Sequence, residues 1–277
     1  MSFAVMPISD YVGACNVIRE KTGSSDAVKS GEMADKIKAV FEAGKASSGF
    51  DDGFNEGQNT EHMAFWDTFT NNGKRTNYNN AFYCDCDAVG WNKNNLKPPY
   101  QLKPTTCTQM FNHLSWNDKN AAPTITPDMV DFSKCTLAYR TFRNAYISRL
   151  VVDFSSLTKM EHTFTTDNNG WMPDTTIKVT EKLTTTDNPF MHNVYGATFT
   201  DDSVIACSIS FSYCTKMTVA QAKSIINALK DFSGTDKEYA CTVKLPTALW
   251  EALDNESTAP NGGSWKDYVY NTKCWNY

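Results

Sequence analysis

The side chains that most often carry enzyme chemistry are sparse in this chain. Only four of its 277 residues are histidines: His62, His113, His162 and His192. None of them has another histidine, a cysteine or a carboxylate at the spacing of a metal-ligand motif. The ordinary interpretation of His162, two residues before Phe164, is a polar position at the rim of a turn. A general base needs hydrogen-bonded partners that the sequence does not reveal, so we predict no catalytic residue.

The nine cysteines give no reactive motif either. Cys84 and Cys86 are too close in sequence for a relaxed disulfide, and a zinc site would need two more ligands, one of which Cys107 could provide. Structural thiols are the favoured alternative. Three other cysteines, at 135, 207 and 214, occupy apolar positions of a repeat and are predicted to be small buried thiols. The nine cysteines are dispersed and odd in number, which predicts that the chain folds in a reducing compartment.

Two loops of similar sequence offer a binding surface instead. Residues 165–172 read TTDNNGWM and residues 185–196 read TTDNPFMHNVYG. Amides beside aromatic rings provide directional hydrogen bonds and a flat apolar platform, as a sugar or peptide ligand requires. The alternative is that the Asx residues form turns while the rings fill the core. The candidate ligand-binding residues are Asp167, Asn168, Asn169, Trp171, Asp187, Asn188, His192 and Tyr195.

A repeated phrase indicates which elements position these loops. The phrase DFSSLTKM at 153–160 recurs in part at 131–136 and at 210–217. Phe132 and Phe154 are 22 positions apart, and a second offset of 57 lays 141–160 on 198–217. Three β-rich runs, near 147–152, 175–180 and 203–209, begin 28 positions apart, with one run in each unit. One strand cannot bury its own apolar face, so we predict that the units stack as coils of a solenoid, with both loops on one side.

Other elements flank this repeat. Apolar periodicity and capping residues predict a hairpin of two short helices at 9–23 and 30–43. An irregular segment at 61–120 is anchored by aromatic residues, namely Phe65, Trp66, Phe69, Phe82, Trp91, Phe111 and Trp116. A C-terminal cap follows the repeat: a helix capped by Thr218, a strand at 239–245, and a helix that begins at Pro246. The aromatic tail after this helix is expected to fold back onto the body.

The sequence therefore predicts an α+β protein in three parts. Residues 1–44 form a helical segment for attachment or oligomerisation, and residues 45–60 form a glycine-rich linker. Residues 61–277 form a short solenoid of parallel strands with an aromatic-rich beginning and an α/β C-terminal cap. We expect no cofactor and no metal.

Composition excludes several classes of partner. The net charge is −5 and the sequence pI is about 5.4, so the chain has no basic field to hold a phosphate backbone, and we expect no nucleic-acid binding. No apolar run approaches the length of a membrane span. The apolar stretch at 1–7 is too short for a signal peptide and has no basic beginning, so we expect no targeting segment.

Two segments resemble known families. The unit TFRNAYISRLVVDFSSLTKMEHTF resembles the BspA-type leucine-rich repeat, although Phe, Met, Cys and Ile replace most leucines. The N-terminal IREKTG followed by SGEMADKI resembles structural proteins of phages and prophages of anaerobic gut bacteria. FWDTF, GKRTNYNNAF and WKDYVYNTKCW are similar to the same phage group. Together these matches touch most of the chain.

The resemblance implies a non-enzymatic virion protein, assembled in the host cytoplasm, that is associated with the tail and recognises a host surface. It implies contacts with other virion proteins through residues 1–44, a homo-oligomer, and a bacterial surface glycan or protein as receptor. The alternative function is architectural: a head decoration, a collar or an adaptor. A bacterial surface adhesin is a further alternative, which the missing signal peptide disfavours, and an enzyme is the most remote.

Overall fold

The computed structural model describes residues 74–82, 101–114, 122–167 and 170–277. The chain divides into two compact units, Met1–Phe65 and Trp66–Tyr277, and every described residue belongs to the second. The helices predicted at 9–23 and 30–43, the linker at 45–60 and the Cys84/Cys86 pair lie outside the described residues. Within the described ranges, no helix has the length and apolar character needed to span a membrane.

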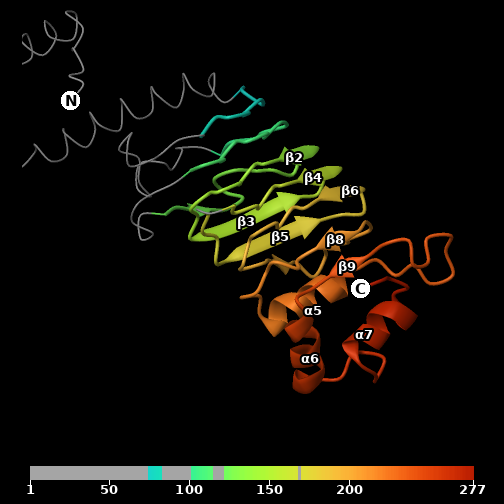
Figure 1. Ribbon diagram of the computed structural model, residues 1–277. Coiled ribbons are helices and arrows are strands. Elements are labelled where there is room, and N and C mark those ends of the chain that lie inside the picture. The colour runs from blue at the N-terminus through green and yellow to red at the C-terminus, as the bar shows by residue number, and fades with distance from the viewer. Residues whose placement is uncertain (1–73, 83–100, 115–121, 168–169) are drawn as a thin grey trace, which may run out of the picture. The chain divides into compact units, whose positions relative to one another are not determined.

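The second unit is a mixed structure of strands and helices in which the strands pair in parallel (Figure 1). The first sheet has the order β1-β3-β5-β7 and the second has the order β2-β4-β6, so successive strands alternate between the two sheets. The bounds are β1 Thr124–Ile125, β2 Leu137–Tyr139, β3 Arg149–Phe154, β4 Lys159–Glu161, β5 Thr175–Val179, β6 Thr185–Asp187 and β7 Thr198–Phe199.

Each pass of the chain thus contributes two strands, where the sequence predicted one. The missed strands β2, β4 and β6 have three residues each, with the sequences LAY, KME and TTD. Only the central residue of β2 and of β4 is buried, and no residue of β6 is. Such segments lack the apolar alternation that identifies a half-buried strand in a sequence.

The strand register confirms the predicted 22-residue offset and corrects the predicted 28-residue offset. The runs predicted near 147–152 and 175–180 are neighbours, as β3 and β5, but Leu150 pairs with Thr175, an offset of 25 and not 28. The next strand of this sheet is β7 at Thr198–Phe199, not a run at 203–209. The 22-residue offset is confirmed in the second sheet, where Leu137 pairs with Lys159.

The repeated phrase encodes a local turn. In each copy the residue three positions after the phenylalanine donates its N–H to the carbonyl of that phenylalanine: Cys135 to Phe132 (2.9 Å), Leu157 to Phe154 (3.0 Å) and Cys214 to Phe211 (2.8 Å). The predicted 57-residue equivalence is nevertheless wrong in space. It would match Phe142 with Phe199, but Phe142 stacks on Phe164 while Phe199 belongs to β7.

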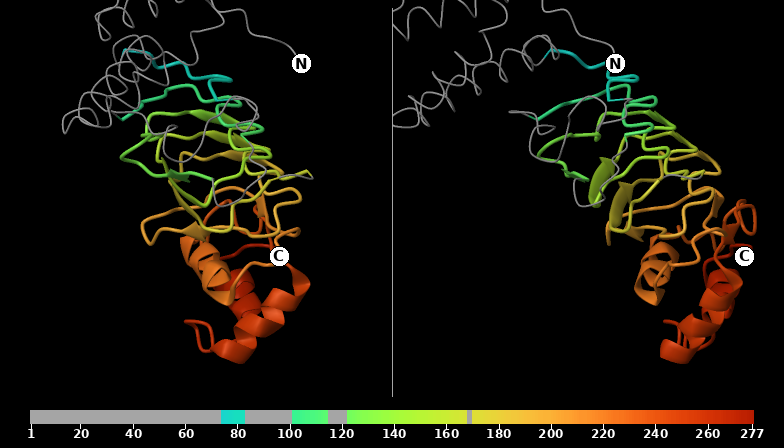
Figure 2. Two further views of the ribbon diagram at one scale, coloured as in Figure 1. Left: turned by 90° about the vertical axis from the view of Figure 1, so that its left-hand side faces the viewer. Right: turned by 60° about the vertical axis from the view of Figure 1, so that its left-hand side comes forward.

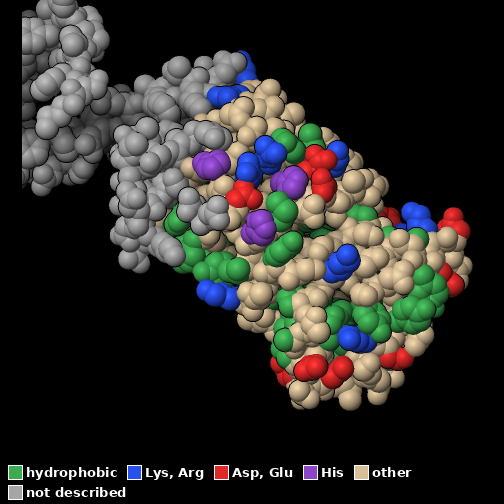
Figure 3. Space-filling model, in the orientation of Figure 1, with side chains coloured by type: hydrophobic (Ala, Val, Ile, Leu, Met, Phe, Trp, Pro, Cys, Tyr) green, Lys and Arg blue, Asp and Glu red, His purple; other side chains and the backbone are tan. Residues whose placement is uncertain are grey.

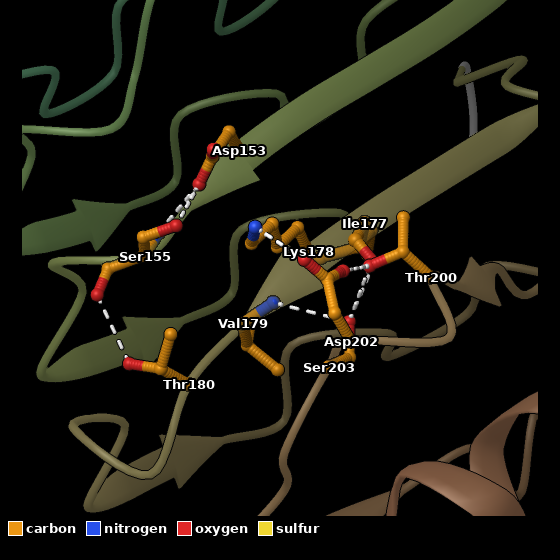
Figure 4. Close-up of polar contacts among 9 residues, drawn as sticks. All are labelled: Asp153, Ser155, Ile177, Lys178, Val179, Thr180, Thr200, Asp202 and Ser203. Atoms are coloured by element: carbon orange, nitrogen blue, oxygen red, sulfur yellow. Dashed lines mark hydrogen bonds and ion pairs between the residues drawn. The ribbon is translucent and has the colours of Figure 1, made fainter.

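Side-chain hydrogen bonds fix these turns at the ends of the first sheet's strands (Figure 4). Asp153 accepts the backbone N–H of Ser155 at 2.8 Å, an Asx-type turn. The Thr180 hydroxyl donates to the Ser155 carbonyl at 3.0 Å, which joins two successive passes of the chain. Lys178 and Asp202 form an exposed ion pair at 2.5 Å between β5 and the segment after β7.

A ladder of phenylalanines forms the core between passes. Phe111, Phe142 and Phe164 stack with ring planes within 8° of parallel and centroids 5.6 and 5.7 Å apart. The ladder continues to Phe82 at one end and Phe190 at the other, with centroid distances of 4.9 Å at both steps. All these rings are at most 1% exposed, so large aromatic side chains provide the apolar volume that leucines do not. The predicted anchoring roles of Phe82 and Phe111 are confirmed.

The C-terminal cap follows the prediction closely. Helix α5 (Val219–Ala228) begins at Thr218, whose side chain forms a capping box with Gln221. Helix α6 (Thr247–Glu256) begins after Pro246. The predicted strand at 239–245 shortens to β9 (Val243–Lys244), which pairs in parallel with β8 (Ile209–Ser210).

The aromatic tail folds back, as expected. It forms α7 (Trp265–Asp267) and the π-helix η3 (Tyr268–Thr272), and Trp275 is fully buried against Phe232. Figure 2 shows these helices gathered at the end of the stacked strands. Helix α5 packs on the last strand of the first sheet, where the Ser224 hydroxyl accepts the backbone N–H of Phe199 in β7 at 3.0 Å.

The described cysteines are all buried thiols with no disulfide: Cys107, Cys135, Cys207, Cys214, Cys241 and Cys274. Burial raises the pKa of Cys207 and of Cys214 to about 12, so both stay protonated at neutral pH. The predicted structural role of the thiols at 135, 207 and 214 is confirmed.

Candidate ligand-binding face

The turns that follow β2, β4 and β6 share one backbone pattern. Their first residues, Arg140, His162 and Asn188, adopt left-handed conformations with φ of 52°, 47° and 42°. Backbone bonds align them, because Arg140 donates to the Glu161 carbonyl and His162 to the Asp187 carbonyl, both at 2.9 Å. Each turn then sends a ladder phenylalanine inward, and Thr141 and Thr163 beside these rings are buried too, while Arg143, Asp167 and His192 stay partly exposed. We call the surface of residues 140–144, 162–167 and 187–195 the turn face.

Asp167 is the centre of this turn face. Its carboxylate accepts hydrogen bonds from the Arg143 guanidinium, with Nε 2.7 Å from Oδ2 and a closer contact from Nη2. The Nδ1 atom of His192 lies 3.8 Å from Oδ1 of the same carboxylate. Burial acts to raise the pKa of Asp167, but the hydrogen bond and charge of Arg143 outweigh it and hold this pKa below its usual value. Asp167 is therefore an anion at neutral pH, bridging two cationic or dipolar partners.

A second imidazole–carboxylate pair joins the turn after β4 to the end of β6. The Nε2 atom of His162 is 3.8 Å from Oδ2 of Asp187, whose side chain is 54% exposed. Asn188 donates to Oδ1 of Asp187 at 2.9 Å, so this carboxylate is oriented by two neighbours. The exposure leaves Asp187 able to accept further hydrogen bonds from outside the protein.

Aromatic groups border these carboxylates on the side of the next turn. The His192 ring meets the edge of Tyr213 at a centroid distance of 5.0 Å, and Tyr213 is 49% exposed. The Lys216 ammonium lies 5.1 Å from the centre of the Tyr195 ring. Both partners come from the turn that begins at Phe211, so the third copy of the repeated phrase extends the face.

The opposite border is formed by the preceding pass of the chain. His113 lies 3.5 Å from the Asn144 amide nitrogen through Nε2. Burial lowers the pKa of His113, the Arg143 charge lowers it further, and the Asp167 charge opposes both. Figure 3 shows the three histidines of the described residues on one face, with basic and acidic side chains beside them.

The structure brings several of the predicted residues together and leaves others apart. Asp167 and His192 are in contact, while Asp187, Asn188 and Tyr195 lie on the same turns. Trp171 is placed by a different contact: it is half-buried and forms a parallel backbone bridge with Tyr146, on the segment that returns to β5. Asn168 and Asn169 lie outside the described residues, so their predicted role stays a prediction.

Arg143, Tyr213 and Lys216 were missed by the sequence reasoning. Their contacts span 24 residues to Asp167 and about 20 to the 187–195 turn, distances at which a sequence motif gives no signal. A usable signal did exist for Tyr213, because it occupies an exposed position within the repeated phrase. Equivalent turns of stacked units align on one side, so a ring there belongs beside the neighbouring turn.

This arrangement suits binding. Within the described residues, no group of three or more His, Cys, Asp or Glu side chains could hold a metal ion. Exposed carboxylate oxygens, imidazole nitrogens and a half-exposed phenol ring combine hydrogen-bonding groups with an apolar surface, as saccharide and peptide sites do. The geometry supports recognition of a hydroxylated or amide-rich surface.

Comparison with models of known protein families, with curated proteins and with solved structures found no match.

Proposed function

We propose that this protein is a non-enzymatic bacteriophage virion component whose turn face binds the surface of the host bacterium. The unit Trp66–Tyr277 acts as a short leucine-rich-repeat-like solenoid, each pass of which adds one turn to that face. The N-terminal residues 1–44 attach the subunit to other virion proteins and promote homo-oligomer formation. The phage assignment rests on the sequence resemblance of the N-terminal motif and the repeat.

One observation carries the binding role. Side chains from turns far apart in sequence form two partly exposed groups: His162 with Asp187, and Arg143 and His192 around Asp167, with Tyr213 against the His192 ring. The exposed fractions of Asp187, His192 and Tyr213 are 54%, 48% and 49%. Folding alone does not require a half-exposed tyrosine beside half-exposed ionisable groups, because these side chains contribute little burial.

The same contacts admit the architectural alternative, in which the turn face binds a neighbouring virion protein as part of a head decoration, collar or adaptor. The two functions differ in the accessibility of the turn face in the assembled particle. A test on the free protein and a test on the particle therefore address different parts of the proposal.

The direct test is binding of the fluorescently labelled full-length protein to intact cells of anaerobic gut bacteria. Tyr213→Ala combined with Asp187→Asn removes a ring and a charge from exposed positions, so folding is preserved. We expect the apparent affinity for cells to fall about tenfold or more, as for substitutions at interface hot spots.

The matched control is Asp202→Asn, which removes an equally exposed carboxylate of the Lys178 ion pair (Figure 4). It lies beside the first sheet, outside the turn face, and should leave binding unchanged. Loss of binding in the control, or full binding by the double variant, would contradict the proposal.

A further inference from the structure

Three exposed tyrosines form a second surface, on the C-terminal cap. Tyr239, Tyr270 and Tyr277 are 39%, 43% and 50% exposed, although large hydrophobic side chains elsewhere in the described residues are mostly buried. The Tyr270 ring contacts both others, with centroids 4.8 Å apart for Tyr239 and Tyr270 and 6.3 Å apart for Tyr270 and Tyr277. Figure 3 shows hydrophobic side chains exposed over the cap. We call these three residues the tyrosine platform.

The fold holds the platform in place from beneath. The Tyr277 ring lies 5.5 Å from the ring of Trp250, which is buried. The Tyr239 backbone adopts φ of 56° and donates its N–H to the Cys274 carbonyl at 2.8 Å. Tyr270 lies in η3, and single π-helical turns of this kind are frequent at functional sites. A pre-positioned ring loses little conformational entropy when it binds a ligand.

The platform is not a by-product of core formation. Val269 and Trp275 lie beside it in sequence and are fully buried, so they provide the apolar packing of this segment. Partly exposed rings therefore add little to the stability of the cap.

The area available fits a small ligand and not a protein. A tyrosine presents roughly 200 Å² of surface, so three rings that are about half exposed offer roughly 300 Å². A stable protein–protein interface needs about 800 Å² from each partner. An exposed apolar patch of this size on a single domain is often functional.

One cation beside the rings is available to a ligand. The Lys266 ammonium lies 5.4 Å from the centre of the Tyr277 ring, and it forms no ion pair with any carboxylate in the part of the chain that the structure describes. The nearby Lys273 is occupied, because its ammonium donates to the Leu229 carbonyl at 2.7 Å. Asp267 is occupied by Asn261 and Asn271.

We infer that the tyrosine platform and Lys266 bind an acidic saccharide. The apolar C–H face of a sugar ring lies on the phenol rings, the phenol hydroxyls exchange hydrogen bonds with sugar hydroxyls, and Lys266 pairs with a carboxylate or phosphate of the sugar. The proposed function enters only as the source of this saccharide, the bacterial surface. The site uses no residue of the turn face.

The test is saturation-transfer NMR and titration of the full-length protein with acidic hexasaccharides. The probes are hexamers of galacturonate, of hyaluronan and of sialic acid, and maltohexaose is the neutral counterpart. We expect transfer from tyrosine ring protons to at least one acidic hexamer, and weaker binding of maltohexaose. Tyr270→Ala should weaken acidic-hexamer binding at least tenfold, and Lys266→Ala should remove the preference for the acidic ligand.

Leu137→Ala, which removes a 37% exposed apolar side chain outside both the platform and the turn face, is the control and should bind the hexamers normally. No binding of any acidic hexamer, or binding that survives both Tyr270→Ala and Lys266→Ala, would overturn the inference. Cell binding separates the two proposals. Cell binding that depends on Tyr213 and Asp187, with no hexamer binding at the platform, supports the proposed function and refutes this inference. Hexamer binding at the platform, with no effect of Tyr213 or Asp187 on cell binding, gives the opposite result.

Discussion

At the scale of single residues, His113 and Asp167 show how the turn face sets charge. Burial lowers the pKa of His113 and raises that of Asp167, and the nearby Arg143 cation lowers the pKa of both groups, so both pKa values lie below their usual values. For Asp167 this favours the charged carboxylate, and for His113 it favours the neutral imidazole. The face therefore carries a defined anion and a neutral ring at neutral pH, a combination that suits hydrogen bonding with a neutral or weakly charged ligand.

The lowered pKa of His113 predicts a pH dependence of stability. At a pH below 6.5, the ordinary pKa of histidine, His113 is protonated in the unfolded chain but stays neutral in the folded protein. The free energy of unfolding therefore falls as the pH decreases through 6.5 towards the pKa of His113 in the folded protein. His113→Gln removes this loss. Urea unfolding at pH 7.5 and pH 5 should show the variant gaining stability relative to the natural protein at pH 5. A difference between the two proteins that is the same at both pH values would contradict this assignment.

The buried thiols predict a low reactivity. The six cysteines among the described residues are all buried, and burial raises the pKa of Cys207 and Cys214 to about 12, which removes the reactive thiolate. In a titration of the native protein with a thiol reagent at pH 8, we expect at most three cysteines to react. All nine should react after denaturation. Rapid labelling of a fourth thiol in the native protein, identified by mass spectrometry, would refute the structural role of these residues.

At the scale of elements, local rules in the sequence located turns and helices better than strand partners. The capping box of Thr218 and the apolar face of α5 were readable because they depend on residues three or four positions apart. β3 and β5 were readable as runs rich in β-branched residues, with the sequences RLVVDF and TTIKV. β7 has two residues and β6 has no buried one, so tertiary pairing and not local pattern makes them strands.

The 57-residue offset shows why repeats mislead about register. Its shared phrase specifies a four-residue turn, and the same turn occurs after β3 and after β8 although these strands belong to different sheets. Local sequence fixes the turn, whereas the register depends on which rings stack. The candidate site was foreseeable to the same extent: Asp167 and His192 were predicted together, but their long-range partners Arg143 and Tyr213 were not.

The phenylalanine ladder aligns the turns, so removing one of its central rings should lower the free energy of unfolding strongly. Phe164 is fully buried between Phe142 and Phe190. Phe164→Ala should lower the free energy of unfolding by about 3–5 kcal/mol, measured by urea denaturation. Tyr213→Ala, an exposed aromatic deletion, should change it by less than about 0.5 kcal/mol. A small effect at Phe164 would mean that the ladder does not hold successive turns together.

At the scale of the whole molecule, the second unit separates a packed core from a set of exposed turns. Its core is a continuous column of rings and strands, its last layer is covered by helices, and its exposed chemistry lies on turns that the core aligns. A rigid scaffold with polar-aromatic loops is a common basis for recognition. In the account proposed here, residues 1–44 anchor this domain to the particle and the turn face meets the bacterium.

The most direct test of this account is immunogold electron microscopy of intact phage particles that carry the protein, with antibodies raised against residues 121–277. We expect gold at the tail tip and antibodies that block adsorption to the host. Gold over the head or collar, or particles that adsorb normally with no epitope accessible, would contradict host recognition by the turn face and support the architectural function.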